Sequence, residues 1–76
     1  MKTYIQHTIT RNYLDSRDSW VMTEMKALEF QTPSDAIAYI SERDFLNVQL
    51  VIVYKNTGNR VLLPLQPRDS LVSIQQ

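Results

Sequence analysis

The fold of this chain is decided by residues 48–65, which read VQLVIVYKNTGNRVLLPL. In the first part of this stretch the apolar residues fall on both sides of an extended chain, with Leu50 and Ile52 on one side and Val51 and Val53 on the other. A strand that is apolar on both faces is usually central in its sheet and covered twice. The stretch therefore predicts an inner strand.

After this strand the chain turns and returns as a second strand. Gly58, the only glycine, lies in a polar run where a hairpin turn with a bulge requires a positive φ. Residues 60–65 alternate again, and we expect Val61 and Leu63 to point inward. Pro64 cannot donate a hydrogen bond to a ladder, so this strand should lie at an edge of the sheet or end there.

Before this hairpin, three consecutive signals mark the start of a helix. Thr32 supplies an N-cap hydroxyl, and Pro33 has the fixed φ that suits the first helical position. Asp35 places a carboxylate near the positive end of the helix dipole. Apolar residues as far as Ile40 follow at helical spacing. We expect one amphipathic helix that ends near Asp44.

The N-terminal part of the chain predicts another hairpin. Residues 4–14 alternate between apolar and polar, which is typical of a half-buried strand. The polar residues 15–19 would form the loop, because Asp and Ser side chains bond nearby backbone in place of ladder partners. Residues 20–30 would form the second strand. Their alternation changes face near Ala27, where we expect a bulge or a bend.

The resulting order, β-β-α-β-β, predicts an α+β fold in which one helix packs on an antiparallel sheet of four strands. A chain of 76 residues should form one small domain, 1–76, with one hydrophobic core. Residues 67–76 carry three apolar side chains among polar ones. For them a fifth short strand, a helical turn and a tail that docks on a partner all remain open.

One helix would leave the other face of the sheet without a cover. That outer face would carry Val51, Val53, Leu62 and Val21, and exposed apolar patches of this kind mark partner surfaces. The formal net charge is zero, which removes the like-charge repulsion that opposes self-association. We therefore expect a homodimer through the sheet, or contact with a larger protein.

The composition favours a soluble cytoplasmic protein. The chain has no cysteine, whereas small secreted domains usually rely on disulfides, so a reducing compartment is the simpler interpretation. The N-terminus alternates and lacks the apolar run of a signal peptide, and no segment approaches the ~20 apolar residues of a membrane span. The absence of net charge gives no global attraction to nucleic acid or to an anionic membrane.

No set of residues predicts catalysis, a cofactor or a metal. A single glycine excludes the common phosphate-binding loops, and the absence of cysteine excludes thiol chemistry and the usual zinc sites. His7 is the only histidine, and a packed or surface imidazole is the simpler interpretation of it. We interpret carboxylate pairs such as Asp15 with Asp18 as solvated charges. We therefore expect no catalytic residue, no cofactor and no metal.

Two kinds of residue are candidates for contact with a protein partner. Arg17 and Trp20 lie in and beside the first predicted loop, and arginine and tryptophan are enriched at binding hot spots. The alternative for Trp20 is that it closes the core at the start of the second strand, which is the commoner place for tryptophan. The other candidates are the outer-face residues Val51, Val53 and Leu62.

These observations favour a non-enzymatic protein-binding module that acts as a homodimer, a small subunit, an inhibitor or an adaptor. The alternative is a nucleic-acid-binding regulator, whose affinity would fall as salt rises. A third interpretation, an enzyme with a composite site across a dimer, would depend on His7. The basic residues that the nucleic-acid alternative would use are Arg11, Lys26, Lys55 and Arg60.

Two resemblances accompany this interpretation. Residues 30–39, FQTPSDAIAY, resemble a strand-turn-helix element of many small α+β domains, including the accessory NADH dehydrogenase subunit family. Two hairpins around one helix are also similar to the architecture of some small phage-encoded anti-CRISPR proteins, which implies an inhibitor of a larger protein. The first resemblance covers ten residues and the second concerns architecture alone, so neither assigns the chain to a family.

Overall fold

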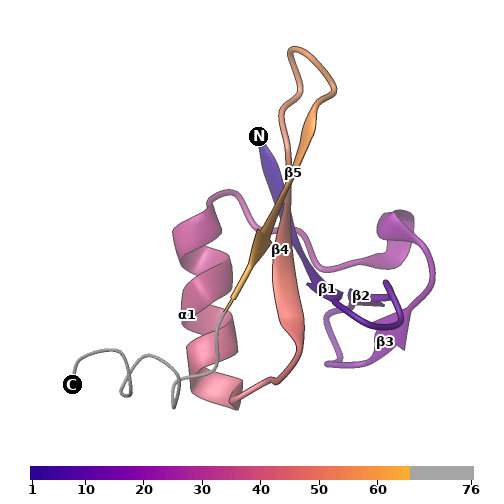
Figure 1. The fold of residues 1–76 in the computed structure, drawn as a ribbon, viewed down its shortest axis with the longest axis vertical. Helices are drawn as coiled ribbons and strands as arrows, with labels where there is room; N and C mark the ends of the chain where they lie inside the picture. The colour runs from indigo at the N-terminus through magenta and orange to yellow at the C-terminus, as the bar shows by residue number, and fades with distance from the viewer. Residues whose placement is uncertain (66–76) are drawn as a thin grey trace.

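Strand β1 (Lys2–His7) lies beside strand β4 (Val48–Val53) in the computed structural model, which describes residues 1–65. Their antiparallel pairing runs from Lys2 opposite Val53 to His7 opposite Val48 and forms the centre of the sheet. The full strand order is β3-β2-β1-β4-β5, and one helix packs on one face of this sheet (Figure 1). The α+β class and the antiparallel sheet predicted from the sequence are confirmed.

Helix α1 (Pro33–Arg43) begins and ends as its sequence signals predict. The hydroxyl of Thr32 accepts a hydrogen bond from the amide of Asp35 at 3.2 Å, which satisfies one of the free donors of the first turn. At the other end Asp44 takes a left-handed conformation with φ of 52°, which stops the helix. The helix therefore presents Ala36 to the sheet from a fixed position.

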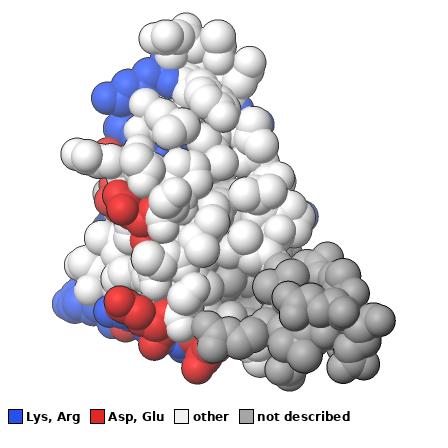
Figure 2. Space-filling view, turned by 90° about the vertical axis from the view of Figure 1, so that its left-hand side faces the viewer, with Lys and Arg blue, Asp and Glu red and all other residues white. Residues whose placement is uncertain are grey.

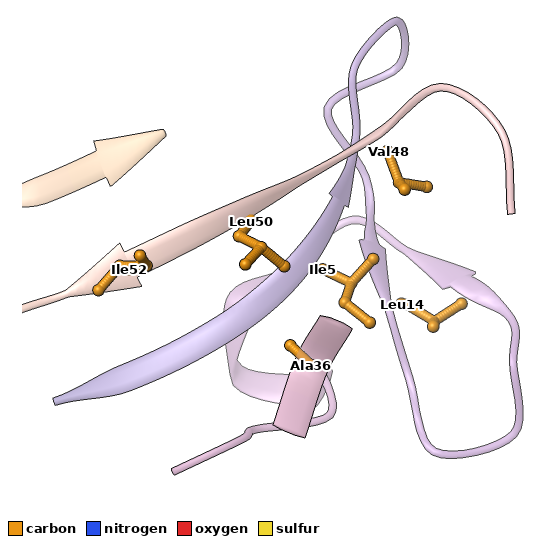
Figure 3. Packing of buried hydrophobic residues seen from close by; sticks show 6 residues of the cluster. All are labelled: Ile5, Leu14, Ala36, Val48, Leu50 and Ile52. Carbon is orange, nitrogen blue, oxygen red and sulfur yellow. The ribbon is translucent and has the colours of Figure 1, made fainter. Parts of the chain in front are cut away.

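The hydrophobic core lies between α1 and the sheet face that carries Ile5. Side chains from both central strands and from the helix converge there (Figure 3). Ile5, Leu50 and Ala36 are completely buried. The cluster consists of Ile5, Leu14, Ala36, Val48, Leu50 and Ile52.

The prediction of a single strand over residues 4–14 is wrong, because the chain reverses direction within this segment. After β1 it turns through residues 8–12 and returns as β2 (Tyr13–Leu14), which places Tyr13 opposite Gln6. Arg11 adopts a positive φ of 66° in this turn. Alternation of polar and apolar residues is compatible with such a turn, so the pattern alone did not reveal it.

The second strand expected over residues 20–30 is also much shorter than predicted. Strand β3 (Trp20–Val21) covers two residues, and the chain then forms a 3-10 helix, η1 (Glu24–Lys26). It then contacts the sheet through the amide of Leu28, which donates to the carbonyl of Leu14 at 2.8 Å, and through a single bridge between Phe30 and Thr3. The change of face near Ala27 thus marks a departure from the sheet, and the sheet has five strands in place of the four expected.

The hairpin of β4 and β5 (Arg60–Pro64) is confirmed. Gly58 has the positive φ, 72°, that the turn requires, and its amide donates to the carbonyl of Tyr54 at 2.8 Å. Strand β4 lies between β1 and β5, as its two apolar faces predict, and β5 is an edge strand that ends at Pro64. The three alternatives for residues 67–76 lie outside the described residues.

The sheet face opposite α1 is partly covered by the chain itself. Glu24 forms an ion pair with Arg60 across this face, and the stretch from Glu24 to Glu29 lies next to Tyr4. In Figure 1 this stretch and α1 lie on opposite sides of the sheet. Tyr4 is consequently buried, with 4% of its surface exposed. No helix within residues 1–65 has the length and hydropathy to cross a membrane.

Candidate functional site

Strand β5 forms one edge of the sheet, and within residues 1–65 it pairs with β4 alone. The amide of Tyr54 donates to the carbonyl of Asn59 at 3.0 Å, and the amide of Leu65 donates to the carbonyl of Val48 at 3.4 Å. These two bonds show which β5 residues direct their backbone groups toward β4. In an antiparallel pair, residues that exchange hydrogen bonds alternate with residues whose backbone faces the other way. The β5 residues whose backbone groups face the free edge are therefore Arg60, Leu62 and Pro64.

Three consecutive large apolar side chains line this edge. Val61, Leu62 and Leu63 are 43%, 48% and 42% exposed, and we call them the β5 patch. Leu62 lies opposite Val51 on the face away from α1, whereas Leu63 lies opposite the core residue Leu50. The patch therefore extends around the strand from one face of the sheet to the other.

The β5 patch is exposed because the two covers of the sheet both stop short of it. Helix α1 packs on β1 and β4, and the stretch from Glu24 to Glu29 lies over Tyr4 of β1. Val61 and Leu63 share the core-facing side of the sheet, as predicted, but the helix leaves them 43% and 42% exposed. The sequence predicted their direction and missed their exposure, although Pro64 did indicate an edge.

Strand β5 itself carries little charge. The one ionised side chain of β5 is Arg60, whose guanidinium is hydrogen-bonded to the carboxylate of Glu24, and this contact raises the pKa of Arg60. Figure 2 shows the side of the molecule that carries α1. Charged side chains gather there toward one margin and toward the lower end, and much of the remaining surface is uncharged. An apolar partner could approach the patch without removing a free charge from water.

The candidate residues of the first loop lie in different surroundings. Trp20 is half-buried and packs against the core, with its ring edge-on to His7 at 5.2 Å and to Phe45 at 6.0 Å between centroids. Arg17 is exposed, and its amide donates to the carboxylate of Asp15 at 2.8 Å. The structure thus gives Trp20 the core-closing position, and it leaves the Arg17 side chain in solvent.

The three valine and leucine candidates of the outer face are divided by the structure. Val51 is only 2% exposed, since it lies between Tyr4 and Leu62 in neighbouring strands. Val53 is half-buried, and Leu62 is the exposed member. An interface over this face would therefore have Leu62 as its accessible residue, with the buried Val51 beside it.

The four basic residues of the nucleic-acid alternative do not form one cluster. Arg11 lies in the turn after β1, and Lys55 lies in the turn between β4 and β5. Because β1 and β4 are antiparallel, these turns are at opposite ends of the central strands. Lys26 belongs to η1, and Arg60 is already paired with Glu24.

His7 has a structural role in the turn that follows β1. Its Nδ1 accepts hydrogen bonds from the amides of Ile9 at 3.1 Å and Thr10 at 3.3 Å. The imidazole ring also packs edge-on against Trp20. These contacts stabilise the reversal between β1 and β2, and they leave Nδ1 occupied by the backbone.

A charged and aromatic cluster connects the loop before β3 to the helix. The hydroxyl of Tyr39 donates to Asp18, and the Nε of Arg43 lies 3.2 Å from the same carboxylate. The guanidinium of Arg43 also stacks 3.5 Å above the centroid of the Tyr39 ring. The hydroxyl bond and the nearby cation lower the pKa of Asp18, and the carboxylate raises the pKa of Tyr39.

Asp15 organises the loop in which Asp18 lies. Its carboxylate accepts the amides of Ser19 at 2.9 Å and Arg17 at 2.8 Å, and these backbone hydrogen bonds lower the pKa of Asp15. The two aspartates predicted to be solvated charges therefore bind specific partners. Their partners are backbone amides and the residues of one helix face, which is an arrangement that holds a loop in place.

A shallow cavity of about 280 Å³ lies beside η1 on the face away from α1. The ammonium group of Lys2 lies 3.7 Å from the carboxylate of Glu29, one of the ion pairs at this cavity. Within residues 1–65 no group of three His, Asp or Glu side chains is arranged to hold a metal ion. The residues lining the cavity are Lys2, Tyr4, Glu24, Met25, Ala27 and Glu29.

Comparison of the chain with protein-family models, with curated proteins and with solved structures found no match.

Proposed function

We propose that this chain is a non-enzymatic protein-binding module whose working surface is the free edge of β5. The observation that carries the proposal is the β5 patch, in which three consecutive large apolar side chains lie on an edge strand. An edge of this kind offers backbone hydrogen bonds and apolar contacts together, which is how sheets accept an added strand. A homodimer, a small subunit, an inhibitor and an adaptor would all need such a surface.

The direction of the β5 backbone groups supports the edge of β5 as the working surface in preference to the outer sheet face. The N–H and C=O groups of Leu62, which have no backbone partner within residues 1–65, point to the edge, where an incoming strand would pair with them. Val51, which lies beside Leu62 on the same face, is too deeply buried to offer contact area. The proposal therefore retains Leu62 and extends the partner surface to Val61 and Leu63.

The test compares two substitutions that make the same chemical change at different places. Leu62→Lys introduces a charge in the β5 patch, whereas Ile9→Lys changes an apolar residue that is 73% exposed in the turn after β1. A photoreactive amino acid at position 62 would capture the partner, and its affinity for each variant would then be measured with purified proteins.

We expect Leu62→Lys to weaken binding at least about tenfold, because a charge directed at the apolar centre of an interface is costly to desolvate. We expect Ile9→Lys to bind as the unchanged protein does. Ile9→Lys should keep the unfolding midpoint, since Ile9 is 73% exposed, and Leu62→Lys should stay folded with a modestly lower midpoint, since about half of Leu62 (48%) is exposed. Equal binding by the two variants would place the working surface elsewhere.

A further inference from the structure

We infer that the strand added at this edge is β5 of a second copy of the chain, antiparallel, with the two-fold axis at Leu62. The inference rests on the proposed function and names the partner of that same surface. It joins two five-stranded sheets into one continuous sheet through their β5 edges.

The backbone groups of the free edge are complementary to a second copy of themselves. Three β5 residues direct their backbone groups outward, and Pro64 is the one without an amide hydrogen. When Leu62 pairs with Leu62 of the second copy, the two residues exchange two hydrogen bonds. The amide of each Arg60 then donates to the carbonyl of the opposite Pro64, which needs no donor in return. All four outward amides of the two edges are satisfied.

The side chains favour the same register. Centring on Leu62 places each Val61 opposite Leu63 of the second copy, so every member of the β5 patch has an apolar cross-strand partner. A shift that centres the pairing on Val61 satisfies the same number of amides. It places Leu63 opposite the polar Asn59, however, and brings the two Arg60 residues to diagonal positions. The register centred on Leu62 is therefore the better of the two.

Charge does not oppose this pairing. In the register centred on Leu62 the two Arg60 residues are separated by four residues along the strands, about 14 Å. This distance exceeds the Debye length of about 8 Å at physiological salt. Each Arg60 is in addition paired with Glu24 of its own chain, and the whole chain has no net charge. Arg60 at one end and Pro64 at the other limit the pairing to the short apolar window between them.

The first experiment uses the fact that the chain has no cysteine. In a hydrogen-bonded antiparallel pair the opposed Cα atoms are about 5.5 Å apart, within the range of about 4.4 to 6.8 Å that a disulfide spans. Leu62→Cys should therefore form a disulfide-linked dimer under mild oxidation. Leu63→Cys, whose counterpart lies diagonally at about 7 to 8 Å, should crosslink at least tenfold more slowly. Ser16→Cys, in an exposed loop, reports random collision.

The second experiment tests the two-fold axis in solution by light scattering over a concentration series. One short strand makes a small interface, so the unchanged protein should pass from monomer to dimer within this series. Leu62→Lys and Leu62→Glu should each be monomeric, because each places like charges opposite one another at the axis. An equimolar mixture of these two variants should form a heterodimer, which only a self-opposed residue 62 allows.

Four results would overturn the inference. Equal crosslinking of Leu62→Cys and Ser16→Cys would refute a two-fold axis at Leu62. A mixture of the two charge variants that stays monomeric would refute it as well. A monomer in which the Leu62 amide resists hydrogen exchange would assign the edge to residues 66–76 of the same chain. A monomer that binds a different protein, and loses it in Leu62→Lys, would refute self-pairing and leave the proposed function intact.

Discussion

Strands β4 and β5 are neighbours in one hairpin and have similar apolar sequences, VQLVIV and RVLLP, but their environments are opposite. Five of the six β4 residues are buried, whereas all five β5 residues are exposed. The difference comes from position, because β4 has a strand on each side and a cover on each face. Apolar content alone therefore does not say whether a strand belongs to the core, and in β5 it marks a surface.

The largest effect expected from this comparison is a difference between two facing leucines. Leu50→Ala should lower the free energy of unfolding by about 2 to 5 kcal/mol, because Leu50 is completely buried in the core. Leu63→Ala, at the partner position on β5, should cost about 1 kcal/mol, since 42% of Leu63 is already exposed. Urea unfolding of both variants measures the difference.

The result for Leu63→Ala also depends on concentration if β5 is covered by a second copy. Measured at low protein concentration, it should stay near 1 kcal/mol. A cost that rises toward that of Leu50→Ala as the protein is concentrated would show that β5 is buried in solution. If Leu63→Ala cost as much as Leu50→Ala at every concentration, the two strands would not differ in burial.

A smaller effect should follow from substitution of the turn that joins the two strands. Gly58→Ala should lower stability by about 1 kcal/mol, because an alanine disfavours the φ of 72° although the space around its Cβ is open. Gly58→Asn should recover part of the loss, since asparagine tolerates this conformation better. Thermal unfolding gives the order Gly, Asn, Ala from most to least stable, and a different order would mean that φ is not the cause.

The ion pair that connects β5 to Glu24 on the outer face should contribute less to stability. Arg60→Gln removes the ion pair with Glu24, and exposed pairs of this kind contribute about 0.2 to 1 kcal/mol. The loss should shrink as salt is raised, because salt screens the pair in the unchanged protein. Unfolding at low and at high salt measures it. A loss that does not change with salt would point to lost packing of the long side chain.

The helix that covers β4 should make stability depend on pH through Asp18 and Tyr39. The folded pKa of Asp18 is lowered, so its contribution is present above the unfolded value near 3.8 and is lost as pH falls through the folded pKa. The folded pKa of Tyr39 is raised, so its contribution is present below 10.0 and is lost as pH rises through the folded pKa.

Tyr39→Phe removes the hydroxyl that couples the two groups. Its stability should therefore fall less steeply than that of the unchanged protein at both the acid and the alkaline end. Unfolding free energies across the pH range compare the two proteins, with Tyr54→Phe as a control at an exposed tyrosine of the β4–β5 turn. Parallel profiles for all three proteins would show that the cluster of Asp18, Tyr39 and Arg43 does not couple stability to pH.

The sequence by itself determined the elements whose signals are local. The helix from Pro33 follows from a cap, a proline and an apolar stripe, and the turn at Gly58 follows from the one residue without a Cβ. The two apolar faces of β4 placed it inside the sheet, and Pro64 placed β5 at an edge. Each of these features depends on a few adjacent residues, so it can be predicted without the rest of the fold.

Only the tertiary structure decided what covers each strand. The sequence of residues 4–14 fits one strand, but the reversal stabilised by His7 divides it into two. The stretch that includes η1 lies beside Tyr4, and Val51 is buried between Tyr4 and Leu62 of the neighbouring strands. The sequence pattern predicted Leu62 as a contact residue, whereas Val61 and Leu63 became candidates only when the structure showed their exposure. The pattern could not show it, because burial depends on segments that are distant in sequence. Periodicity fixes the direction of a side chain, and the neighbouring elements determine whether it meets protein or water.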